Sequence, residues 1–157
     1  MKEKSRKKKE YDMIHLIKTQ YILDAMFLLT QRWSNIIDKK LKEKNLTATQ
    51  LLFLLKLDKG FSKHPSFTEV GEAMSISHQN VKQIAKILEK KELLEIYQDA
   101  KDRRTKRIAL HYETKKMLIN MEQEKKTIAE LFDVLSEKEV EELFSVIKRL
   151  EMHSYES

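Results

Sequence analysis

Residues that break helices are scarce in this chain, which contains only two glycines and one proline among its 157 residues. From about Tyr11 to Lys44 neither residue occurs, and apolar residues recur at spacings near three, four and seven. This pattern predicts one long amphipathic helix. A helix of that length exceeds what a small core can cover, so we expect part of its apolar surface to meet another chain.

Capping residues divide the sequence that follows into shorter helices. Thr47 is the predicted N-cap of a helix that ends at Gly60. Thr68 and Ser77 are the predicted N-caps of two short helices separated by a two-residue turn. Two short helices joined by a tight turn form a helix-turn-helix.

The hydrophobic period changes from helical to alternating after Leu93. The segments "LLEIYQ" and "TKRIALH" alternate, and the charged "DAKDRR" lies between them. We interpret them as a two-stranded hairpin with a basic tip, which completes a winged helix. Helices are predicted again from about Glu113 to Leu135, and after Ser136, which forms a capping box with Glu139.

The helix after Ser77 presents amides and lysines opposite its apolar face. Glutamine can bond bidentately to adenine, and lysine to guanine, in the major groove. The N-terminal half of such a helix usually enters the groove deepest, and Lys86 and Lys90 would lie nearer the DNA backbone. An ordinary solvated helix surface is the alternative. The residues expected to contact DNA on this helix are Ser77, His78, Gln79, Asn80, Lys82, Gln83 and Lys86.

The hairpin tip adds positive charge to the same region. Lys101, Arg103 and Arg104 suit the negative potential of a narrow minor groove. Asp102 is expected to stabilise the wing by orienting an arginine through an ion pair. Residues 76–107 contain nine Lys/Arg and five Asp/Glu, a balance of 9 − 5 = +4, which favours a polyanionic partner. A flexible, merely solvated tip is the alternative.

Three segments, "LTATQLLFLL", "SISHQNVKQIAKILEKKELLEI" and "DAKDRRTKRIAL", resemble the MarR family of bacterial transcription regulators. The family's wing signature is Asp-x-Arg, five residues and Leu-Thr, and here Asp102, Arg104 and Leu110 match it. The likeness covers roughly residues 46–118. Three positions depart from the family pattern: Glu92 and Thr114 stand where glycine is usual or frequent, and His111 where threonine is common.

The resemblance implies a mainly α winged helix-turn-helix protein with six helices and three strands, the first strand preceding the helix-turn-helix. It divides the chain into a tail and dimerisation helix (residues 1–45), a DNA-binding domain (46–112) and C-terminal dimerisation helices (113–157). It further implies a homodimer that binds double-stranded DNA at a pseudo-palindromic operator. We expect a repressor released by a small aromatic or anionic effector. A winged-helix adaptor that binds proteins, without sequence-specific DNA binding, is the alternative.

Several other classes of protein are disfavoured. Without cysteine the chain has no disulfide and no thiol chemistry, and its five histidines lack metal-ligand spacing. No catalytic constellation stands out, so we expect neither an enzyme nor a cofactor. The basic start "MKEKSRKKKE" is interpreted as a frayed tail, with a DNA-backbone arm as the alternative. No signal peptide or membrane-spanning segment is recognised, so a cytoplasmic protein is expected.

Overall fold

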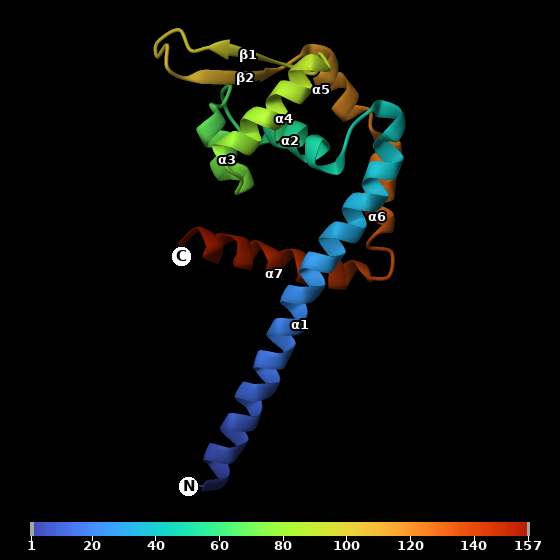
Figure 1. The fold of residues 1–157 in the computed structure, drawn as a ribbon. Helices are drawn as coiled ribbons and strands as arrows, with labels where there is room; N and C mark the ends of the chain where they lie inside the picture. The colour runs from blue at the N-terminus through green and yellow to red at the C-terminus, as the bar shows by residue number, and fades with distance from the viewer. Residues whose placement is uncertain (1, 157) are drawn as a thin grey trace. The chain divides into compact units, whose positions relative to one another are not determined.

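The computed structural model describes the backbone of residues 2–156 and the side-chain surroundings of residues 12–121 and 124–154. The chain divides into two compact units, residues 1–48 and 49–157. The elements, labelled in Figure 1, are α1 (Lys2–Leu41), a 3₁₀ turn (Lys42–Lys44), α2 (Ala48–Lys59), α3 (Phe67–Met74), α4 (His78–Lys90), β1 (Leu94–Gln98), β2 (Lys106–Leu110), α5 (Tyr112–Ile119), α6 (Glu122–Glu130) and α7 (Glu137–Glu156). None of these helices, over the part that is described, is long and apolar enough to cross a membrane.

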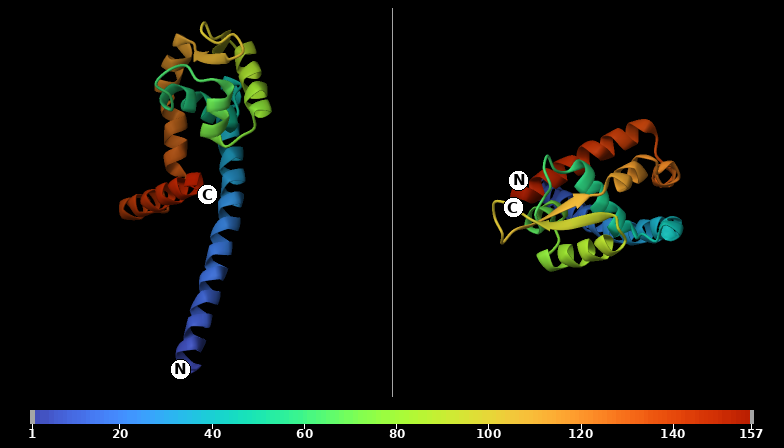
Figure 2. Two further views of the ribbon diagram at one scale, coloured as in Figure 1. Left: turned by 90° about the vertical axis from the view of Figure 1, so that its left-hand side faces the viewer. Right: turned by 90° about the horizontal axis from the view of Figure 1, so that it is seen from above.

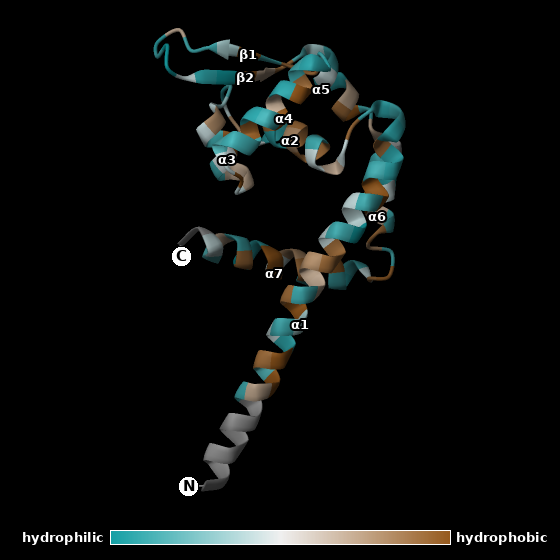
Figure 3. Ribbon diagram, in the orientation of Figure 1, coloured by the Kyte–Doolittle hydropathy of each residue, from teal (hydrophilic) through white to brown (hydrophobic). Residues whose placement is uncertain are grey.

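The first unit consists of α1 and the 3₁₀ turn. The helix begins at Lys2, so the prediction of a frayed basic tail is wrong for the backbone. The side chains of that basic segment, and with them the alternative of a DNA-backbone arm, lie outside the described residues. Apolar residues on α1 face outward along much of its length (Figure 3), and Tyr21 and Phe27 are 73% and 66% exposed.

Two capping interactions set the bounds of the helix-turn-helix. The predicted cap Thr68 is wrong, because Ser66 and Glu69 form a complete capping box two residues earlier. The Ser66 hydroxyl accepts the Glu69 N–H at 3.2 Å, and a Glu69 carboxylate oxygen accepts the Ser66 N–H at 2.7 Å. Ser77 caps α4 as predicted, since its hydroxyl accepts the Asn80 N–H at 3.2 Å.

Helices α3 and α4 pack closely across the turn between them. Val70 and Val81 are fully buried there. A Cβ atom added at Gly71 would lie 2.9 Å from the carbonyl oxygen of Ile76. Glycine in mid-helix costs about 1 kcal/mol relative to alanine, and this close approach is the reason for its presence.

The predicted hairpin is present, and it lies beside α4 in each view (Figures 1 and 2). Its strands pair antiparallel, with Leu94 opposite Leu110 and Ile96 opposite Ile108. The predicted strand before the helix-turn-helix is reduced to one bridge, between Ser66 and Arg107. Pro65 has no N–H to extend that ladder, and Ser66 already turns into the cap of α3.

The region after the hairpin differs from the single long helix that was predicted. Residues 112–130 form two helices, α5 and α6, because the backbone leaves the helical region at Met121, where ψ is 57°. This turn buries the Met121 side chain, which is 4% exposed. The predicted capping box of the last helix is confirmed, with the Ser136 N–H donating to Glu139 at 2.8 Å.

Three helix ends are closed by non-glycine residues with positive φ: Asn45, Ser75 and Glu92, at 52°, 53° and 57°. At each end, the N–H of this residue and the N–H of the next residue donate the two hydrogen bonds of a Schellman motif. After α4 the Glu92 N–H donates to the Glu89 carbonyl at 2.9 Å, and the Leu93 N–H donates to the Leu88 carbonyl at 3.1 Å. An L-residue in this conformation costs about 1–2 kcal/mol.

The three departures from the MarR pattern meet at this junction. The Nδ1 atom of His111 lies 2.8 Å from the carbonyl oxygen of Glu92. The Thr114 hydroxyl donates to the carbonyl of Leu93 at 2.6 Å. Side chains of His111 and Thr114 thus bind the backbone around the residue that replaces glycine.

We predict that Glu92→Gly stabilises the protein. Glycine adopts the left-handed conformation without the steric cost that Glu92 has. The unfolded chain gains conformational entropy, which costs about 0.5–1 kcal/mol, so the net gain in the free energy of unfolding is up to about 1 kcal/mol. At fixed protein concentration this corresponds to a rise in Tm of about 2–4 °C. Lys86→Gly, at an ordinary helical position of α4, is the matched control and should destabilise by about 1 kcal/mol. Thermal melts that rank the two variants in the opposite order would contradict the assignment.

Candidate nucleic-acid interface

The outer face of α4 is solvent-exposed and its inner face is buried, as its pattern predicted. Val81, Ala85 and Leu88 are each 0% exposed. Within the described part of the chain, no hydrogen bond or ion pair engages the side chains of the amides and lysines on the other face. The predicted residues Ser77, His78, Gln79, Asn80, Lys82, Gln83 and Lys86 are all exposed, as is Lys90.

A small cavity of about 250 Å³ brings part of α4 and the wing together. Two predicted residues of α4, His78 and Lys82, line it with Arg104 of the wing. Thr68 and Lys106 also line it, and sequence reasoning missed both. Thr68 was predicted to be a helix cap and was therefore not considered as a contact. Lys106 is a basic residue directly after the wing, and that position and charge could have identified it as a DNA contact.

Asp102 stabilises the wing differently from the prediction. Its carboxylate accepts the backbone N–H of Arg104 at 3.0 Å and the hydroxyl of Thr105 at 2.7 Å. The predicted ion pair to a wing arginine is therefore wrong, because the short side chain of Asp102 turns back onto its own loop. Over the described residues, Lys101, Arg103 and Arg104 have no side-chain hydrogen bond or ion pair and are exposed.

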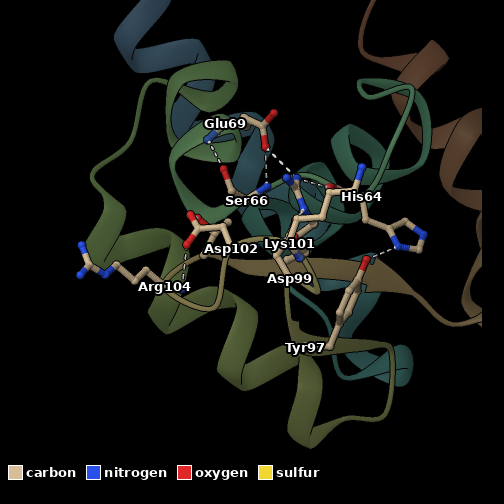
Figure 4. A network of polar contacts seen from close by, with 10 residues as sticks. His64, Ser66, Glu69, Tyr97, Asp99, Lys101, Asp102 and Arg104 are labelled. Carbon is tan, nitrogen blue, oxygen red and sulfur yellow. Dashed lines mark hydrogen bonds and ion pairs between the residues drawn. The ribbon is translucent and has the colours of Figure 1, made fainter.

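A second aspartate, Asp99, ties the base of the wing to β2 (Figure 4). One of its oxygens accepts the backbone N–H groups of Lys101 and Asp102 at 2.7 and 3.1 Å. Its other oxygen pairs with Nε of Arg107. Sequence reasoning missed this pair, since the two residues are eight positions apart and only the hairpin register shows that they meet.

Arg107 extends these contacts to the start of α3. Its Nη1 atom donates to the His64 carbonyl at 2.8 Å and lies 3.4 Å from a carboxylate oxygen of Glu69. The Arg107 side chain is only 22% exposed. The same Glu69 oxygen accepts the Ser66 N–H of the α3 capping box.

Hydrogen bonding lowers the pKa values of both carboxylates below their ordinary values. The Arg107 guanidinium and the N–H groups of the wing loop lower the pKa of Asp99 to about 2. The pKa of Glu69 is lowered mainly by the backbone and hydroxyl of Ser66. Because these pKa values lie below the unfolded ones, the carboxylates stabilise the fold above the unfolded pKa and lose that effect as the pH falls through the folded pKa.

A larger cavity of about 720 Å³ lies between the hairpin and the loop from α2 to α3. Phe61, Tyr97 and Leu110 supply apolar lining, and Lys63 and Lys115 supply positive charge. Tyr97 is held by its hydroxyl, which lies 2.8 Å from Nδ1 of His64. No group of three or more metal-ligating side chains occurs in the portion that the structure describes.

Comparisons with known proteins agree with this arrangement. A family profile described as "MarR family" matches residues 44–105. The Staphylococcus aureus MepR–DNA complex has 22% identity and a TM-score of 0.72, covering 82% of this chain and 94% of that chain. The transcriptional regulator SlyA has 20% identity and a TM-score of 0.75, over 86% and 94% of the two chains.

A third similar structure is BpsR of Bordetella bronchiseptica, whose DNA binding is regulated by 6-hydroxynicotinic acid. It has 20% identity and a TM-score of 0.69, over 80% of this chain and 89% of that chain. At these identities the structures establish the fold, and the profile match covers residues 44–105, which is less than half of the chain. The predicted resemblance to the MarR family is therefore confirmed over residues 44–105, and the predicted winged helix fold is confirmed as well.

Proposed function

We propose that this protein is a cytoplasmic, dimeric transcription regulator that binds DNA in a sequence-specific manner and represses transcription. The observation that carries the proposal is the exposed, unengaged amide-and-lysine face of α4 next to an arginine-tipped wing. MepR, which has the same fold, has been crystallised with DNA. We propose no catalytic activity for the chain.

The contacts divide by chemistry. Gln79, Asn80 and Gln83 read base edges in the major groove, because amides offer paired donors and acceptors. The hydroxyl of Ser77 and the basic residues of α4 contact the phosphate backbone. Thr68 and Lys106 are included among these contacts because they line the smaller cavity together with His78, Lys82 and Arg104. Lys101, Arg103 and Arg104 enter the minor groove.

Apolar surface on α1 supports a dimer. The predicted stripe of Ile14, Ile17 and Tyr21 is 48–73% exposed. Leu16 and Leu23, on the opposite side of the helix, are each 56% exposed. A helix that is apolar on more than one side is normally buried, and a second copy of this chain would bury it. Helix α7 also exposes apolar residues, including Phe144 at 60%.

We predict that Gln83 and Arg104 contribute differently to DNA binding. Gln83→Ala should cost about 1–3 kcal/mol on the preferred sequence and relax the preference at one base pair. Arg104→Ala should weaken binding to all sequences and reduce the slope of affinity against salt by about 1. Sequences selected from a random DNA pool supply the operator, and fluorescence anisotropy at several salt concentrations measures binding.

The control for both variants is Lys59→Ala, which removes a charge at the end of α2. We expect the selected operator to contain two half-sites about 34–36 Å apart. If both variants bound like the parent, the contact assignment would be wrong. Binding that ignores sequence, or no binding at low salt, would favour the protein–protein adaptor instead.

We predict that Leu23→Glu dissociates the dimer. Losing the burial of a leucine costs about 1.5–3 kcal/mol, and two-fold symmetry doubles the loss, so the dimer Kd should rise by about 10²–10⁴. Gln79→Glu adds the same charge at an exposed position of α4, outside the proposed dimer surface, and serves as the control. Sedimentation over a concentration series measures both. A monomeric parent, or an unaffected Leu23→Glu dimer, would contradict the assignment.

We also propose that an aromatic carboxylate occupies the larger cavity and releases the protein from DNA. The cavity combines apolar side chains with lysines, and its volume lies within the range of small-molecule sites. BpsR, similar in fold, responds to such an acid. The acid is favoured over a neutral analogue because the basic lining residues outnumber the acidic ones. They are Lys63, Lys101, Arg107 and Lys115, against Asp58 and Asp99, and Asp99 is paired with Arg107.

We predict that 6-hydroxynicotinic acid, or another acid in a panel of aromatic carboxylates, raises the Tm and lowers operator affinity. A ligand at 100 times its Kd stabilises the folded state by about 2.7 kcal/mol. The corresponding amide should bind less well, and Lys115→Ala should weaken binding of the acid whereas Lys59→Ala should not. The absence of any thermal shift at millimolar concentrations across the panel would rule out this class of effector.

A further inference from the structure

We propose that Arg107 is a positioning residue for DNA binding: it holds the wing in a fixed place relative to α4, so that the wing arginines reach the minor groove. This inference rests on the proposed function and extends it, because Arg107 was not among the expected DNA contacts. Arg107 lines the larger cavity and is absent from the lining of the smaller one, where α4 and the wing residues meet.

The wing loop has few links to the rest of the protein. The hydrogen bonds and ion pairs that the structure gives to residues 99–105 join partners within residues 98–107. Asp99 collects the N–H groups of Lys101 and Asp102 on one oxygen and presents the other to Arg107. A displacement of the Arg107 guanidinium would therefore be transmitted to the loop that carries the wing arginines.

Arg107 carries this connection out of the hairpin. Its Nη1 atom donates to the His64 carbonyl at 2.8 Å and approaches Glu69 at 3.4 Å. Glu69 is the N3 residue of the capping box that begins α3, and α3 packs directly against α4. Figure 4 shows the continuous series of contacts from Ser66 and Glu69 to Asp99 and the wing loop.

The backbone near Arg107 supplies a further attachment of the hairpin. The Ile108 N–H donates to the Pro65 carbonyl at 3.0 Å, and Ser66 forms a bridge with Arg107 itself. These contacts keep the base of the hairpin in place without Arg107's side chain. Loss of the guanidinium is therefore expected to free the wing loop while the helix-turn-helix and the strands remain folded.

The test is a double-mutant cycle between Arg107→Met and Arg104→Ala, read as operator affinity. In the parent protein Arg104→Ala should weaken binding about tenfold. In the Arg107→Met background the wing no longer reaches the groove, so the same change should weaken binding less than about twofold. Equal effects of Arg104→Ala in both backgrounds would overturn the proposal.

The matched control is Lys106→Met, which removes the same charge one residue earlier and leaves the contacts to Asp99 and Glu69 intact. It should weaken binding through lost charge, while the tenfold effect of Arg104→Ala is retained. If Lys106→Met abolished the Arg104 effect as fully as Arg107→Met, the effect would be one of charge and not of position.

A measurement without DNA separates this inference from the proposed function. Hydrogen exchange of the Lys101 and Asp102 amides, which donate to Asp99, should quicken in Arg107→Met while exchange within α4 is unchanged. Unchanged wing exchange would overturn the positioning role even if DNA binds, and faster wing exchange without any DNA binding would refute only the function. If Arg107→Met does not fold, Glu69→Gln, which keeps a capping residue at N3, replaces it with the same expected direction.

Discussion

The packing of α3 against α4 is the contact on which the rest of the second unit depends. Gly71 has no side chain, so the carbonyl oxygen of Ile76 can approach α3 closely; a Cβ atom at Gly71 would lie 2.9 Å from that oxygen. Val81 and Leu88 are then fully buried. Burial of that face requires the amides and lysines on the other side of α4 to face solvent, so packing in the core determines which residues can meet DNA.

Substitutions at the junction between α4 and the hairpin illustrate how local strain is accommodated. Glu92 adopts a conformation in which glycine would be unstrained, and the side chains of His111 and Thr114 bind the carbonyls of Glu92 and Leu93. The Leu93 carbonyl also accepts the backbone N–H of His111 at 3.3 Å, so these carbonyls have protein partners. The turn after α4 is therefore bound by side chains from the start of α5.

Local patterns predicted most of the fold, and tertiary contacts account for what they missed. The caps Ser77 and Ser136, the helical period of α4 and the alternation of the hairpin are local and were recovered. The break at Met121 depends on burial of its side chain, which no local pattern encodes. Likewise the exposed face of α4 followed from periodicity, whereas the contact between Arg107 and Glu69 joins residues 38 positions apart.

The hydrogen bonds made by the acidic residues of the wing explain how the wing can be well ordered and still present a basic surface. Asp99 and Asp102 lie within the most positively charged part of the hairpin, where free carboxylates would repel a polyanion. Their oxygens are instead directed at backbone N–H groups, Thr105 and Arg107. Of the basic residues in this hairpin, Arg107 is used to neutralise Asp99, and this leaves Lys101, Arg103 and Arg104 without carboxylate partners in the structure. The order of the loop thus depends on Asp99, Asp102 and Arg107, whereas the positive charge of its tip comes from Lys101, Arg103 and Arg104.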